Sequence, residues 1–158
     1  MNTVCNKIRL YPKKAQETAL NETLDVCRLA YNSMVHERTT LHEQGLKSPT
    51  FCTQAPTLAR RKKDHAELKT VHSQVLQNVG RRVELAFRSF FRRVKAGETP
   101  GYPRLKGKGQ YDSITYPQSR FSVGQSTVSL SLLGKQEQVK AKIHRAIVGT
   151  VKTCTVRR

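Results

Sequence analysis

The sequence predicts an α+β fold in which a small antiparallel β-barrel is interrupted by an inserted helical bundle. Apolar residues recur with a helical period between residues 14 and 95, and with a period of two after residue 112. A short alternating segment at the N-terminus must find its β partners beyond the helices. Helices placed between the first strand and the remaining strands favour the α+β class.

The first strand is predicted in residues 4–10, VCNKIRL, where Val4, Ile8 and Leu10 are the apolar members. Tyr11-Pro12 ends it, because proline lacks the N–H group that strand pairing needs.

The first helix is predicted over residues 14–44. Its apolar residues step by four, three, four and three positions, which places them on one face, and Gly45 provides a stop. The second helix is predicted from Ser48-Pro49 to about Lys63, because serine caps a helix and proline suits its first turn. Pro56 inside that segment should kink the helix or delay its start.

The third helix is predicted over residues 73–95, with Gly97 after its end. Gly80 in its middle costs about 1 kcal/mol relative to alanine and permits a close approach by a neighbour or a ligand. The apolar faces of these helices are expected to pack against one another as an antiparallel bundle.

Residues 98–112, which contain GYPRLKGKG and are called the strap below, connect the helices to the second half of the barrel. Short β-type segments separated by Gly, Ser and Gln follow: SITYPQ, RFSV, TVSLSLL, VKAKIHRAI and VKTCTV. The predicted organisation is residues 1–12 for the first barrel strand, 13–97 for the helical lobe, 98–112 for the strap and 113–158 for the remaining strands.

Charge favours nucleic acid as the partner. Lys and Arg number 29 against 11 Asp and Glu, which gives a net charge of +18. So large a charge opposes compaction unless a polyanion neutralises it, and each cation placed on a phosphate releases counterions. A merely solvated basic surface is the alternative.

No membrane partner is expected, since no apolar run approaches the roughly 20 residues that span a bilayer. The N-terminus lacks the apolar middle of a signal peptide, which favours a cytosolic location with reduced cysteines. The cysteines form no CxxC pair and the histidines show no ligand pattern, so zinc is not expected.

An ordered series of segments resembles the N-terminal half of TnpB. TnpB is a family of transposon-encoded RNA-guided DNA nucleases whose members are often named transposases. The series is KIRLYPKKAQ, CRLAYN, VHSQVLQN, AFRSFF, GYPRLKGKG and KIHRAIVGTVKTCTV. The resemblance implies a wedge-type barrel split by a helical recognition lobe. It also implies guide RNA and target DNA as partners, in a prokaryotic cytosol and associated with the nucleoid.

The resemblance bears on catalysis as well. In the family, a RuvC-like nuclease domain follows the strand that matches KTCTVRR, whereas this sequence stops at Arg158. A two-metal nuclease site needs several converging carboxylates, and beyond Gly101 the chain has only Asp112 and Glu137. We therefore expect no catalytic residues and no metal site here, with magnesium needed only by the RuvC domain, and a barrel that is open at one edge.

The strap carries the first candidate binding residues. In an extended backbone, Arg104, Lys106 and Lys108 would face one phosphate chain together, and Tyr102 could stack on a base. The alternative is a linker with solvated charges, on which Tyr102 packs against the barrel.

Cationic candidates also occur on the first strand, at the start of the first helix, on the third helix and in the late strands. A bound phosphate would offset the conflict between lysines and the positive end of a helix dipole. For the first strand and the late strands, an ordinary polar exterior is the alternative. These candidates are Lys7, Arg9, Lys13, Lys14, Arg81, Arg82, Lys142 and Arg145.

The resemblance further implies that the starts of the second and third helices contact the DNA motif beside the target. The matching positions are Phe51, Gln54, Gln74 and Gln77. Glutamine can pair with adenine in a major groove, although exposed amides are also common on ordinary surfaces.

Three functions remain open from the sequence. The leading one is nucleic-acid binding without catalysis. A nuclease half completed in trans by a separate RuvC-containing chain is the second, and a basic RNA-binding protein of ribosomal type is the third.

Overall fold

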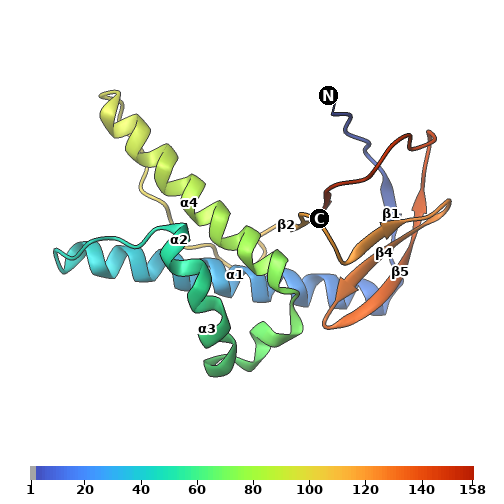
Figure 1. Cartoon of the computed structure of the whole chain (residues 1–158), viewed down its shortest axis with the longest axis horizontal. Coiled ribbons are helices and arrows are strands. Elements are labelled where there is room, and N and C mark those ends of the chain that lie inside the picture. The colour runs from blue at the N-terminus through green and yellow to red at the C-terminus, as the bar shows by residue number, and fades with distance from the viewer. Residues whose placement is uncertain (1–2) are drawn as a thin grey trace.

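The computed structural model describes residues 3–158. The long helix α1 (Lys14–Glu43) runs along the molecule and contacts both its helical part and its β part (Figure 1). The N-terminal part of α1 lies beside a β-sheet, and its C-terminal part lies with the other helices. The predicted α+β class is confirmed. Residues 1–2 of the predicted first-strand segment lie outside the described residues.

The predicted second helix is broken at Pro56. Helix α2 (Phe51–Gln54) is followed by a 3₁₀ turn, η1 (Ala55–Thr57), and then by α3 (Leu58–Asp64). Proline cannot donate the helical hydrogen bond and crowds the preceding turn, so the expected interruption occurs where it stands. A second 3₁₀ turn, η2 (Ala66–Thr70), leads into the long helix α4 (Ser73–Lys95), which has the predicted bounds.

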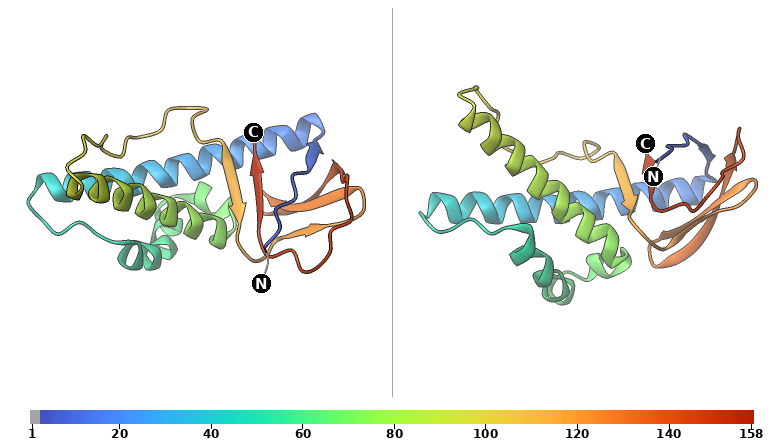
Figure 2. Two further views of the ribbon diagram at one scale, coloured as in Figure 1. Left: turned by 90° about the horizontal axis from the view of Figure 1, so that it is seen from above. Right: turned by 45° about the horizontal axis from the view of Figure 1, so that its top comes forward.

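Four strands form one antiparallel sheet in the order β1-β5-β4-β3. Their bounds are β1 (Arg9–Tyr11), β3 (Phe121–Val123), β4 (Thr127–Leu132) and β5 (Lys135–Lys142). The other two, β2 (Ser113–Tyr116) and β6 (Cys154–Arg157), pair antiparallel as a separate ribbon, and they lie side by side in Figure 2. Among residues 3–158 the strands do not close into a barrel.

Three strand predictions were wrong in their bounds, and for the last of them, VKTCTV at residues 151–156, pairing covers residues 154–157. Strand pairing at the N-terminus covers residues 9–11 instead of 4–10, since β5 ends opposite Arg9, at Lys142. Strand β5 occupies residues 135–142 instead of 139–147, because the turn at Gly134 returns the chain directly beside β4. Residues 143–147 leave the sheet after Lys142.

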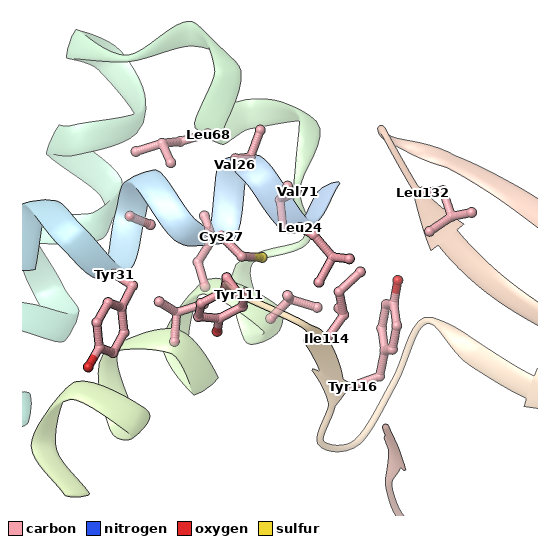
Figure 3. Close-up of a cluster of buried hydrophobic side chains, with 14 of the residues drawn as sticks. Leu24, Val26, Cys27, Tyr31, Leu68, Val71, Tyr111, Ile114, Tyr116 and Leu132 are labelled. Atoms are coloured by element: carbon pink, nitrogen blue, oxygen red, sulfur yellow. The ribbon is translucent and has the colours of Figure 1, made fainter. Parts of the chain in front are cut away.

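Strand β2 joins the helical core to the sheet. Ile114 and Tyr116 are almost fully buried and lie between α1 and Leu132 of β4 (Figure 3). The Tyr116 hydroxyl donates a hydrogen bond of 2.8 Å to the Ser131 carbonyl oxygen. Burial raises the pKa of the Cys27 thiol in this core to about 12, so that thiol stays protonated.

Gly80 brings α2 against α4. A Cβ atom at this position would lie 3.3 Å from the Phe51 ring and 3.4 Å from the Met34 sulfur. The close approach that the glycine predicted is therefore made by a neighbouring side chain of the same protein.

Candidate nucleic-acid interface

The strap has no regular secondary structure, yet two side chains hold it on α1: Asn32, and Arg28, whose guanidinium donates to the Lys106 carbonyl oxygen at 3.5 Å. The Asn32 amide oxygen accepts from the Lys106 N–H at 2.8 Å, and the Asn32 amide nitrogen donates to the Lys106 carbonyl oxygen at 2.9 Å. These two bonds satisfy both backbone polar groups of Lys106. The strap therefore crosses α1 at a fixed position, with Arg104 and Lys108 exposed on either side of Lys106.

Lys106 lies over an aromatic ring instead of extending freely. Its ammonium group is 5.5 Å from the Tyr31 ring centroid, and the Arg82 guanidinium is 5.4 Å from the Tyr111 ring centroid. With Asp112 these residues line a cavity of about 210 Å³. The strap thus places cations and phenol groups together at one opening.

The last residues of the chain add charge to the same region. Arg158 donates to the Gly109 carbonyl oxygen at 2.7 Å and to the Asn21 side chain at 3.1 Å. Arg157 donates to the Asp112 carboxylate at 3.0 Å, in an exposed ion pair. Sequence reasoning did not select these arginines, because only the fold brings residues 157–158 beside the strap.

Tyr102 lies against α4 instead of the barrel. Its ring meets Phe87 and Phe90 edge to face, with centroids 5.6 and 5.1 Å apart. The side chain is still 37% exposed, so one part of the ring packs and another faces solvent.

The starts of α2 and α4 form a second surface, which we call the α4 surface and define as Phe51, Gln77 and Arg81. Gln77 and Arg81 are one turn apart and exposed, and the Arg81 guanidinium lies 5.4 Å from the Phe51 ring centroid. Gln74 lies at its edge and exchanges hydrogen bonds with Ser119 and Gln118 of the β2–β3 turn.

Two residues that were predicted to contact nucleic acid form hydrogen bonds within the protein instead. Gln54 is 1% exposed, and its amide group is hydrogen-bonded to Arg38, Glu37 and the Met34 carbonyl oxygen, so it cannot reach DNA from this position. Arg82 is half-buried and donates to Ser113 and Thr115, which ties α4 to β2. A pattern of helix positions places Arg82 on a polar face, but it does not reveal that a strand covers that face.

The remaining cationic candidates lie at the sheet end of the molecule, and all are exposed: Lys7, Arg9, Lys13, Lys14, Lys142 and Arg145. Arg9 and Lys142 are direct cross-strand partners. Lys13 precedes α1, where its N–H donates to the Gln16 side chain at 3.1 Å. The predicted residues therefore fall into three groups: the strap, the α4 surface and the sheet.

The carboxylates do not fit a magnesium site. Within residues 3–158, no three His, Cys, Asp or Glu side chains come together in a way that could hold a metal ion. Most of the Asp and Glu side chains that form an ion pair do so with an arginine, as Glu84 does with Arg38 and Asp112 does with Arg157. The described residues supply cationic and aromatic groups, which suit phosphates and bases.

Comparison with known proteins finds a relative that matches nearly the whole of this chain. The chain is 30% identical over 153 residues to "Putative RNA-guided DNA endonuclease InsQ" of Escherichia coli strain K12, an alignment that covers 95% of this chain. The resemblance to TnpB-type nucleases is confirmed. This chain spans 36% of the length of that TnpB-type relative.

A family described as a helix-turn-helix domain, of the IS605 OrfB type, matches residues 5–47. In the structure this segment of the TnpB-like chain contains β1 and the single helix α1. Within the match, the described residues form no second helix, so the name of the family does not describe the local geometry here. No helix in the described part of the chain is both long and apolar enough to cross a membrane.

Proposed function

We propose that this chain is a nucleic-acid-binding module of TnpB type, which holds RNA and target DNA and leaves strand cleavage to residues outside the described segment. The single observation that carries the proposal is the strap, which Asn32 fixes on α1 at Lys106 and which Arg158 and Arg157 contact at Gly109 and Asp112. A fixed row of cations loses little conformational entropy when it binds a phosphate backbone.

The α4 surface supports DNA as one of the ligands. Gln77 carries an exposed amide, and Arg81 next to it carries a charge held over the Phe51 ring. An amide of this kind can pair with a base edge, while an arginine adds a phosphate contact that is independent of sequence. This pair is therefore proposed to contact the motif beside the DNA target.

Binding of duplex DNA with randomised flanking sequence tests the proposal. Gln77→Ala is expected to relax the preference among flanking sequences. Arg81→Gln should weaken binding to all sequences and reduce the slope of log affinity against log salt by about 1. Gln44→Ala, an exposed amide just after α1, is the matched control and should bind as the unchanged chain does.

An unchanged sequence preference in Gln77→Ala would contradict the assignment of the α4 surface. Competition with ribosomal RNA separates this function from that of a general structural RNA binder. If ribosomal RNA displaced the bound DNA and a bound guide RNA equally well, the result would favour a general structural RNA binder.

A further inference from the structure

The apolar side of α4 continues beyond the part of the helix that packs against α1. Successive residues of a helix are rotated by about 100°, so Val83, Phe87, Phe90 and Val94 lie along one side. Val83 and Phe87 are buried, whereas Val94 is 49% exposed. Figure 1 shows the C-terminal end of α4 extending away from α1, so the side of the helix that is buried in the core faces solvent at this end.

Four side chains make up this uncovered end, which we call the distal apolar surface: Phe90, Phe91, Val94 and Tyr102. Phe91 is 53% exposed, and Tyr102 of the strap is 37% exposed. The Phe90 ring meets both of them edge to face, with centroids 5.2 Å from Phe91 and 5.1 Å from Tyr102. Because these rings already pack against one another, they form a fixed apolar ridge instead of separate faces that could stack on bases. Such a ridge fits the apolar side chains of a protein partner.

Exposed cations lie on both sides of the distal apolar surface. Helix geometry places Lys95, Arg88 and Arg92 beyond Phe91 on one side, and Arg93 on the other side. An apolar stripe between two rows of like charge is the pattern of a helix surface that receives an oppositely charged amphipathic partner.

The carboxylates of the chain neutralise these cations only in part. Glu84 lies 3.7 Å from Arg88, and Glu98 lies 3.7 Å from Arg93, both in ion pairs with exposed arginines. Exposed ion pairs of this kind contribute little to stability, so a partner can replace them at small cost. Among residues 3–158, no carboxylate pairs with Arg92. The surface therefore keeps a surplus of positive charge.

We propose that the distal apolar surface docks an acidic amphipathic helix of a partner protein. The apolar side of that helix packs on Phe91, Val94 and Tyr102, and its flanking carboxylates pair with the cations beside them. Charge complementarity selects this partner, because a second copy of the chain would bring the same cations against them. This role is protein recognition, and it does not depend on the nucleic-acid surfaces proposed above.

Fluorescence anisotropy of a labelled synthetic peptide of about 18 residues, at about 0.15 M salt, tests the proposal. The peptide carries leucine at every third or fourth position and glutamate at the flanking positions. Phe91→Ala should weaken its binding about tenfold, because aromatic anchors contribute most of the affinity of such interfaces. Arg92→Gln should weaken it about threefold, since exposed ion pairs contribute less.

Leu85→Ala is the matched control. Leu85 is as exposed as Phe91, at 53%, but it lies nine residues before Val94, about two and a half turns away and therefore on the opposite side of α4. This variant should leave the affinity for the peptide unchanged. A second peptide of the same composition, with its leucines distributed around the helix, carries the same charge and should bind about tenfold more weakly.

Equal affinity for the two peptides, or an unchanged affinity in Phe91→Ala, would show that charge alone attracts the peptide and would overturn the proposal. Dimerisation of the unchanged chain that Phe91→Ala abolishes, measured by light scattering, would assign the surface to a second copy instead. Weaker binding of a single-stranded oligonucleotide in Phe91→Ala, with peptide binding unchanged, would assign it to nucleic acid. The melting temperature of each variant separates lost contacts from lost folding.

Discussion

At the scale of single residues, Asn32 has the most direct link to function. It lies on α1, 74 residues before Lys106, and it pairs with both backbone polar groups of that residue. Its side chain therefore holds the strap on α1.

Asn32→Ala is expected to lower the free energy of unfolding by about 1–3 kcal/mol, because it leaves the Lys106 N–H without a partner and the Lys106 carbonyl oxygen with only the 3.5 Å contact from Arg28. Urea unfolding measures this cost. Hydrogen exchange at the Lys106 amide should also become faster.

Asn6→Ala, at an exposed position in the N-terminal segment, is the control and should change neither measurement. If Lys106 exchanged at the same rate in Asn32→Ala, the strap would be held in some other way.

At the scale of elements, the Glu84 carboxylate links α2 to both long helices, in addition to the hydrogen bonds that Gln54 of α2 makes to α1. Glu84 of α4 accepts from Arg38 of α1 at 2.8 Å and from the backbone N–H of Phe51, at the start of α2, at 3.1 Å. Arg38 is 3% exposed and its guanidinium lies 5.0 Å from the Phe87 ring centroid. The position of α2, and hence that of the α4 surface, depends on this ion pair.

Burial alone acts to raise the pKa of the Glu84 carboxyl, but the hydrogen bonds from Arg38 and Phe51 outweigh it and hold the pKa below its ordinary value. The folded state therefore favours the ionised carboxylate. Its contribution to stability is present above the ordinary glutamate pKa and is lost as the pH falls through the lower value of the folded state.

Glu84→Gln should lower the free energy of unfolding by about 3 kcal/mol at pH 7, because the buried Arg38 loses its counter-charge. The difference between the variant and the unchanged chain should shrink as the pH is lowered from 7 toward about 3, because the carboxylate takes up a proton as the pH falls through its lowered pKa. Urea titrations at both values measure it. Glu22→Gln, at an exposed position on α1, should show neither effect, and a cost that did not depend on pH would refute the account.

The helices and strands also show which features of the fold could be predicted from the sequence. Periodicity predicted α4 with its bounds and the break at Pro56, because apolar spacing and proline chemistry are local properties. It failed for β1 and β5, where the partner strand decides which residues pair. It also failed for Gln54, since burial of this residue beside Arg38 and Glu37 depends on two segments, α1 and α2, that meet only in the fold.

At the scale of the whole molecule, exposed cations lie on several separate surfaces. The strap, the α4 surface and the sheet each carry exposed cations, and they hold part of the net charge of +18. Self-repulsion of this size is a cost in the free protein that a polyanion relieves. The fold therefore suits a chain that contacts nucleic acid at several places at once.

Affinity for RNA as a function of salt concentration tests the central claim most directly. The account predicts that log affinity falls linearly with log salt, and that the double variant Arg104→Gln/Lys108→Gln reduces the slope by about 1.4, or about 0.7 for each lost contact. Lys47→Gln/Lys63→Gln removes the same charge at exposed positions outside the strap and should leave the slope unchanged. An affinity that does not depend on salt, or a slope that the two double variants reduce equally, would contradict the claim that the strap binds a nucleic-acid backbone.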